Sequence, residues 1–224
     1  GDAAVPLEVL READSLQFQL PNEALNRVVR WGSGVASRVR RIYSRESTSS
    51  LLDLGVQEFE GISQINAHAV ALQGLHLSDY LNLSLLNLID VSDPKLLADC
   101  ENLAELLLWK TDLRKTGLSW SKGCSKLNRI SLVECKGWSS QSSDESFVAE
   151  LLEIVKPSKE FRLSQILQYF PRVDSLVLEK VAPTMIDCEV PKRIKLFIVN
   201  GETKRIDSTK KATVEAEITR NFGN

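Results

Sequence analysis

Two segments, offset by 24 residues, decide the fold of this chain. The first, Cys100–Leu113, reads CENLAELLLWKTDL, and the second, Cys124–Gly137, reads CSKLNRISLVECKG. Five positions match in chemistry at this single offset: Cys100/Cys124, Leu103/Leu127, Leu106/Ile130, Leu108/Leu132 and Thr111/Cys135. Self-similarity at a fixed offset is the sequence signature of a repeat architecture.

The LxxLxL spacing in these segments has a specific physical meaning. Its last two apolar positions alternate on a short strand, so both side chains enter one core, and a return segment brings the chain back one strand spacing, about 4.8 Å, away. One coil cannot bury its own leucines, so coils must stack. The spacing recurs, less regularly, at Val173, Leu176, Leu178 and Val181 and at Ile194, Phe197 and Val199.

The same residues carry a resemblance to a known family. The LxxLxL pattern resembles that of leucine-rich repeat proteins, and Cys100 and Cys124 with Gly117-Leu118 resemble the cysteine-containing class found in F-box and related adaptor proteins. The resemblance covers residues 100–137 and, more loosely, 173–181, and the chain diverges from the pattern elsewhere. It implies an α/β fold, an irregular leucine-rich-repeat-like solenoid with parallel strands.

Three parts are expected along the chain. Residues 1–50 form a helical N-terminal cap, residues 51–190 form the solenoid with an insertion at 136–172, and residues 191–224 supply a C-terminal β-hairpin or edge-strand cap. Caps are needed because the terminal coils of a solenoid would otherwise expose their apolar faces.

Local signals support these parts. Leu20–Val29, LPNEALNRVV, resembles the opening of an F-box, and the alternative is a plain helix with a proline near its first turn. Helices are expected within the insertion at Glu145–Val155 and Lys159–Tyr169. Asn200-Gly201 favours a tight hairpin turn, and Ala212–Ile218 alternates strictly.

Two registers compete upstream of the clear repeats. One uses Leu72, Leu75 and Leu77, and the other uses Leu83, Leu86 and Leu88. They lie 11 residues apart, which is too close for both to be full coils, so the sequence leaves the choice open. With the second register, the outward-facing positions are Leu85, Asn87 and Ile89.

Charge and cysteine content exclude several classes of protein. The 28 basic and 30 acidic residues give a net charge of −2, so no global field draws the chain to nucleic acid or to an anionic membrane. No apolar run approaches the ~20 residues that span a bilayer. The four cysteines form no CxxC pair, which favours reduced thiols and an intracellular protein, cytoplasmic or nuclear. An organelle stays open because the chain starts at Gly1 without a methionine.

Catalytic motifs are missing from the sequence. It contains no HExxH, no phosphate-binding GK[ST] loop, no GxSxG and no dinucleotide fingerprint. The two histidines, His68 and His76, have no cysteine or carboxylate cluster at metal-ligand spacing. We therefore expect no enzymatic activity, no metal, no cofactor and no small-molecule substrate.

Strand alternation predicts the binding surface. If Leu106 and Leu108 point into the core, their neighbours point outward on the concave sheet face, and equivalent residues of other coils continue the row. The predicted partner-binding residues are Glu105, Leu107, Trp109, Arg129, Val133, Glu134, Val177 and Glu179. An aromatic anchor in an apolar stripe with a charged rim is typical of protein-binding surfaces. The alternative is that the insertion, or another part of the chain, covers this stripe.

A second candidate surface is basic. Six arginines fall within nineteen residues: Arg27, Arg30, Arg38, Arg40, Arg41 and Arg45. Trp31 and Tyr43 lie among them, and arginines with aromatic residues can hold phosphates and stack bases. The alternative is a solvated helix face with ordinary ion pairs.

These observations favour a non-catalytic protein–protein interaction module, a scaffold, adaptor or subunit of a larger assembly, without membrane insertion. One alternative is an RNA-associated factor that contacts phosphates through Arg27–Arg45. The other, implied by the F-box resemblance, is a ubiquitin-ligase substrate receptor.

Overall fold

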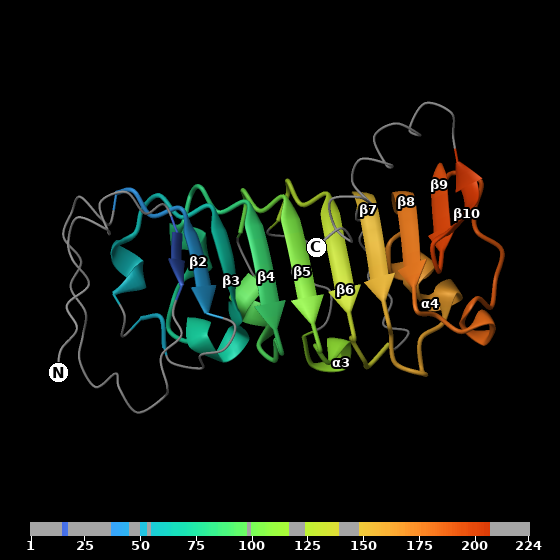
Figure 1. The fold of residues 1–224 in the computed structure, drawn as a ribbon, viewed down its shortest axis with the longest axis horizontal. Helices are drawn as coiled ribbons and strands as arrows, with labels where there is room; N and C mark the ends of the chain where they lie inside the picture. Colours follow the sequence, from blue (N-terminus) through green and yellow to red (C-terminus); the bar gives the residue numbers. More distant parts are fainter. Residues whose placement is uncertain are drawn as a thin grey trace.

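The protein has an α/β fold built on one ten-stranded sheet, as a computed structural model shows for residues 15–17, 37–44, 50–52, 55–97, 100–116, 124–138 and 148–206. The strands are β1 (Ser15–Gln17), β2 (Arg41–Ser44), β3 (Gln64–His68), β4 (Leu85–Ile89), β5 (Glu105–Trp109), β6 (Arg129–Val133), β7 (Val148–Val155), β8 (Arg172–Glu179), β9 (Leu196–Val199) and β10 (Glu202–Ile206). They lie side by side in chain order (Figure 1). The first nine are parallel, and β10 is antiparallel to β9. This confirms the predicted α/β class and parallel strands.

Short helical segments connect the strands. They are η1 (Val56–Glu58), η2 (Ala69–Leu72), η3 (Leu77–Asp79), η4 (Pro94–Leu97), α3 (Leu113–Thr116), α4 (Leu163–Tyr169) and η6 (Pro183–Met185). Their apolar residues join those of the strands in one core, in which Phe59 and Phe161 are fully buried. α4 lies behind β8 and β9 in the view of Figure 1. Among the described residues, no helix has the length and apolarity needed to cross a membrane.

Alternation along β5 and β6 follows the prediction. Leu106 and Leu108 of β5, and Leu132 of β6, are fully buried in the core, and Ile130 is 1% exposed. The residues between them point to the opposite face of the sheet, which we call the front face.

The structure decides between the two upstream registers. Leu86 and Leu88 enter the core from β4, so the second register is correct. Leu72 and Leu77 lie instead on the short helices η2 and η3 of the connecting segment. The strand β3 before them was not predicted, because its sequence, QINAH, has only one strongly apolar residue, Ile65.

The helix predicted at Glu145–Val155 is wrong, because Val148–Val155 is the strand β7. Val148, Leu151, Leu152 and Val155 have helical spacing, which explains the prediction. β7 pairs in parallel with β6 and β8, and these hydrogen bonds and the burial of its core side outweigh the local pattern. The predicted insertion at 136–172 therefore contributes a strand to the sheet. The second predicted helix, Lys159–Tyr169, is confirmed over the extent of α4.

The two ends differ in how they compare with the predictions. The Asn200-Gly201 turn is confirmed: both residues have positive φ, 49° and 80°, and they join β9 to antiparallel β10. Ala212–Ile218 lies outside the described residues, as does the F-box-like Leu20–Val29. Where residues 1–50 are described as regular structure, they form β1 and β2, not the predicted helix.

A backbone feature that the sequence did not reveal follows the strands β4 to β9. The residue directly after each strand has positive φ: Asp90, Lys110, Glu134, Lys156, Lys180 and Asn200. A left-handed conformation costs a non-glycine residue roughly 1–2 kcal/mol. Hydrogen bonds to the next strand stabilise this conformation. The N–H of Lys110 donates to Val133 O at 2.9 Å, and the N–H of Glu134 donates to Val155 O at 2.8 Å. These residues recur every 20 to 24 positions, which indicates that one strand and its connecting segment together form one repeat unit.

Candidate functional site

The front face carries rows of side chains that run across the strands in register. The middle row consists of Tyr43, Asn66, Asn87, Leu107, Ser131, Glu153, Val177 and Ile198. The row nearer the carboxyl ends of the strands consists of His68, Ile89, Trp109, Val133, Val155 and Glu179. Because neighbouring strands lie about 4.8 Å apart, residues in one row are side by side.

An apolar patch occupies the centre of this face. We call it the Trp109 surface, and it consists of Ile89, Leu107, Trp109, Val133 and Val155. Val133 is 8% exposed, and the other four residues are half-buried. The structure thus brings the predicted Leu107, Trp109 and Val133 together and adds Ile89 and Val155 to them.

Charged residues border the Trp109 surface at the amino ends of β5 and β6. Glu105 and Arg129 lie in register, with 3.9 Å between Arg129 Nη1 and Glu105 Oε1. Their side chains are 40% and 33% exposed, so this ion pair contributes at most about 1 kcal/mol to stability. These two predicted residues are accessible enough to meet a partner.

The other three predicted residues lie outside the Trp109 surface. Val177 is separated from Val133 because β7 lies between β6 and β8. Glu134 follows β6 in the left-handed conformation, and Lys156 Nζ donates a hydrogen bond to its Oε1 at 2.8 Å, which lowers the pKa of the Glu134 carboxyl. Glu179 is on the front face at the carboxyl end of β8, where its Oε1 accepts a hydrogen bond from Gly201 N at 3.0 Å.

Val177 belongs to a second apolar group on the same face. We call it the Ile198 cluster, and it consists of Leu151, Val177, Leu196 and Ile198. It forms a cluster distinct from the main core behind the sheet. Leu196 and Ile198 are 1% and 2% exposed, whereas Val177 is 8% exposed, as is Val133, and Leu151 is half-buried, so the deepest burial in this cluster is on β9.

The predicted basic surface is described only in part. Arg27, Arg30 and Arg45 lie outside the described residues. Arg40 donates from Nη1 to Ser37 O at 2.7 Å, which holds its guanidinium against the backbone. Arg41 and Tyr43 share the front face of β2. Phosphate binding by this segment stays a prediction.

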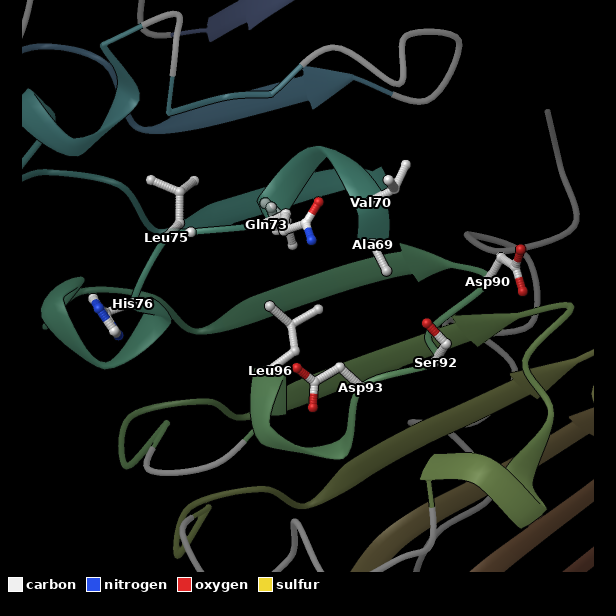
Figure 2. Close-up of a pocket in the computed structure, with 11 residues that line it drawn as sticks. Ala69, Val70, Gln73, Leu75, His76, Asp90, Ser92, Asp93 and Leu96 are labelled. Carbon is white, nitrogen blue, oxygen red and sulfur yellow. The ribbon is translucent and has the colours of Figure 1, made fainter.

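A groove lies between the connecting segments that follow β3 and β4. Its volume is about 420 Å³, and its lining residues are Ala69, Val70, Leu72, Gln73, Gly74, Leu75, His76, Asp90, Ser92, Asp93 and Leu96. Figure 2 shows His76 at one end of the groove and Asp90 at the other. His68 is not part of it, because His68 ends β3 on the front face. The two histidines therefore do not face one site, and no group of three or more potential metal ligands occurs among the described residues.

The buried cysteines are poorly suited to nucleophilic chemistry. Cys100, Cys124 and Cys135 are buried free thiols. Burial raises the pKa of Cys135 to about 12, so the reactive thiolate is scarce at neutral pH. Cys100 and Cys124 pack with the main core, as expected of small apolar filling.

No family model, no curated protein and no solved structure matches this chain.

Proposed function

We propose that this chain is a non-catalytic protein–protein interaction module, a subunit or adaptor of a larger assembly, and that it binds its partner through the Trp109 surface. The observation that carries the proposal is the apolar row Ile89, Trp109, Val133 and Val155 across four adjacent strands. Both faces of parallel sheets are usually covered, so half-buried apolar side chains in the middle of one face favour a partner.

The chemistry of this surface fits protein recognition. Trp109 supplies a large aromatic anchor, and Glu105 and Arg129 supply a charged border. Tryptophan and arginine are enriched among the residues that dominate binding energy at interfaces. This combination supports a protein partner over a small molecule.

The spacing of the row also favours one kind of partner. Successive side chains in the row are about 4.8 Å apart, and residues three or four apart on a helix surface are about 5–6 Å apart. An amphipathic helix lying across the strands therefore matches the row along its apolar side.

The fold we propose is an irregular leucine-rich-repeat-like solenoid. Three features support it: strands in chain order, a left-handed residue after six successive strands, and side-chain amides that bond to the preceding repeat. Asn82 Nδ2 donates to Glu60 O at 3.3 Å, and Asn102 Nδ2 donates to Leu81 O at 2.8 Å. Each unit is thus bonded to its neighbour, as stacking of repeats requires.

Affinity purification from the source organism, with quantitative mass spectrometry, tests the function. The full chain is compared with Trp109→Ala and with Leu81→Ala, a matched control because Leu81 is 72% exposed and lies outside the front face. Losing an anchoring tryptophan typically weakens binding by about 2 kcal/mol or more. Partners recovered by the parent chain should be lost with Trp109→Ala and kept with Leu81→Ala.

Folding must be shown for each variant by its melting temperature. Val155→Lys serves as a second disruption of the same surface from a different strand. If the parent, Trp109→Ala and Val155→Lys all recover the same partners in the same amounts, the proposed function is wrong.

A further inference from the structure

The chemistry of the front face is symmetric about the line midway between β5 and β6 (Figure 1). Outward from this line the strands pair as β5 with β6, β4 with β7 and β3 with β8. In the row nearer the carboxyl ends, Trp109 then pairs with Val133, and Ile89 pairs with Val155. Both pairs are apolar, so the Trp109 surface is matched on its two sides.

The row nearer the amino ends has the same symmetry, with opposite charges beside the line. This row consists of Gln64, Leu85, Glu105, Arg129, Leu151 and Ser175. Across the line the acidic Glu105 pairs with the basic Arg129. The next pair outward, Leu85 with Leu151, is apolar on both sides.

The middle row of β4 to β7 contributes less to this face. Asn87 and Ser131 are 7% and 8% exposed, and only Leu107 and Glu153 are half-buried. Across the line Glu153 pairs with Asn87, whose amide can donate a hydrogen bond to a carboxylate. The two outer rows therefore supply most of the accessible surface.

The strands farther from the line continue the match. The pairs formed by β3 and β8 are Gln64 with Ser175, Asn66 with Val177 and His68 with Glu179. The first and last of these pairs are polar on both sides. Both residues of the middle pair are 8% exposed, so they take little part in a contact.

A symmetric face of this kind matches a second copy of itself. In a twofold interface the same patch is used by both copies, and each residue meets its pair in the other copy. An axis parallel to the strands, midway between β5 and β6, lays β5 of one copy over β6 of the other and keeps each row over the same row. Glu105 of each copy then meets Arg129 of the other, and Trp109 meets Val133.

Other twofold axes fit this face worse. An axis that runs across the strands exchanges the two outer rows, which places Glu105 over Trp109 and Arg129 over Val133. An axis midway between β4 and β5 places Glu105 over Leu85. Each arrangement buries a charge against an apolar side chain, which costs more than its contacts return.

The front face is large enough for such an interface. The eight strands from β2 to β9 span about 38 Å, and five residues of a strand span about 16 Å, which gives about 600 Å² per copy. Two copies together would bury about 1,200 Å², at the lower end for specific interfaces. The pair should therefore dissociate on dilution.

We propose that the partner at the Trp109 surface is a second copy of this chain, docked face to face about the axis midway between β5 and β6. This inference rests on the proposed function, because it assigns the partner of the same surface. An amphipathic helix matches the row from Ile89 to Val155, whereas a second copy matches this row and the charged row together. Twisted sheets pack with their strands within about 30° of each other, so the pairs nearest the axis should match best.

Reciprocal charge reversal in the full chain tests this pairing. Glu105→Arg gives a chain with two bases at these positions, and Arg129→Glu gives a chain with two acids. A dimer of either variant alone would place like charges opposite each other twice. A mixed dimer would place opposite charges together twice. Sedimentation velocity at increasing concentration measures the dissociation constant in each case.

The parent chain should form a concentration-dependent dimer. Each variant alone should have a dissociation constant at least about tenfold higher, and the equimolar mixture should return to within about threefold of the parent. A structural role of the Glu105–Arg129 ion pair cannot explain this recovery, because neither variant chain contains that pair.

The matched controls are Glu101→Arg and Lys126→Glu. They make the same changes of charge at exposed positions that precede β5 and β6 and lie outside the three rows. Both should dimerise like the parent, and melting temperatures should show that all four variants are folded.

Every other outcome overturns the inference. A parent chain that stays monomeric up to about 0.5 mM would exclude the second copy. A dimer kept by both front-face variants, or a mixture that stays monomeric, would place the interface elsewhere. A monomeric parent whose affinity purification still recovers a different protein that Trp109→Ala loses would rule out the second copy alone and leave the proposed function standing.

Discussion

Two regions of one sheet face, the Trp109 surface and the Ile198 cluster, differ in how far they are covered. β5 reads ELLLW and alternates between half-buried and buried residues, whereas β9 reads LFIV and all four residues are buried. A continuous apolar run is typical of a strand covered on both faces, and alternation is typical of a strand with one face open. The front-face residues of β9 are therefore buried, whereas those of β5 are half-buried.

The largest expected effect separates the two sides of β5. Leu106→Asp places a carboxylate in the core, where Leu106 is fully buried, and an unpaired buried charge should leave the domain unfolded. Leu107→Asp changes a residue of the front face and should lower the free energy of unfolding by about 1 kcal/mol or less. Circular dichroism with thermal melting distinguishes these outcomes. Equal damage from the two substitutions would contradict the assignment of faces.

A matched isoleucine pair compares the two regions directly. Ile198→Ala removes a side chain that is 2% exposed and should lower the free energy of unfolding by about 2–4 kcal/mol. Ile89→Ala acts on a half-buried residue of the Trp109 surface and should cost about 1 kcal/mol. Urea titrations of both variants measure the difference. Similar losses would mean that the two regions are covered alike.

Alkaline pH probes the core that lies behind both regions. The folded pKa of Cys135 is raised by burial from 9.0 to about 12, so between these values the unfolded chain loses a proton that the folded chain keeps. Stability should therefore fall as pH rises through this window, by up to about 1.4 kcal/mol per pH unit.

Thermal melts from pH 8 to 11 check this, and Cys135→Ala should reduce the fall between pH 9 and 10, leaving the part due to Cys188, whose pKa is also raised by burial. Tyr80, whose pKa burial raises to about 12, should still lower stability above pH 10 in that variant. A slope unchanged by Cys135→Ala would contradict the assignment to this thiol.

The smallest predicted effect tests what the two regions share. Lys110 after β5 and Lys180 after β8 have the same left-handed backbone. Lys110→Val and Lys180→Val should each cost about 1–2 kcal/mol, since a β-branched residue tolerates positive φ poorly. Unfolding titrations should give equal losses at the two positions. A loss of stability at only one of these positions would show that the backbone after the strand differs between the two regions.

Much of the fold could be predicted because the signals were local. The LxxLxL spacing located β5, β6 and β8, and Asn200-Gly201 located the hairpin between β9 and β10. β7 could not be assigned correctly, because the apolar spacing of Val148–Val155 suits a helix and only pairing with β6 and β8 makes it a strand. The residues with left-handed backbone are not glycines, so no residue type marks their positions in the sequence. Their regular recurrence could be seen only in the backbone φ angles.

The candidate site could be predicted only in part. Alternation placed Glu105, Leu107, Trp109, Arg129 and Val133 on one face. It could not show that β7 separates Val177 from them, since this depends on strand order. The burial of Val177 depends on its neighbours Leu151 and Ile198 on β7 and β9, which local spacing does not encode.

The measurement that tests the account most directly is the accessibility of the two regions in one chain background. Ile89→Cys and Ile198→Cys, each combined with Cys188→Ser, are labelled with maleimide under native conditions, with Cys124 as the control for folding. The thiol at position 89 is expected to react at least about tenfold faster than the thiol at position 198. Equal rates at the two positions would contradict it, because the Trp109 surface would then be no more open than the Ile198 cluster.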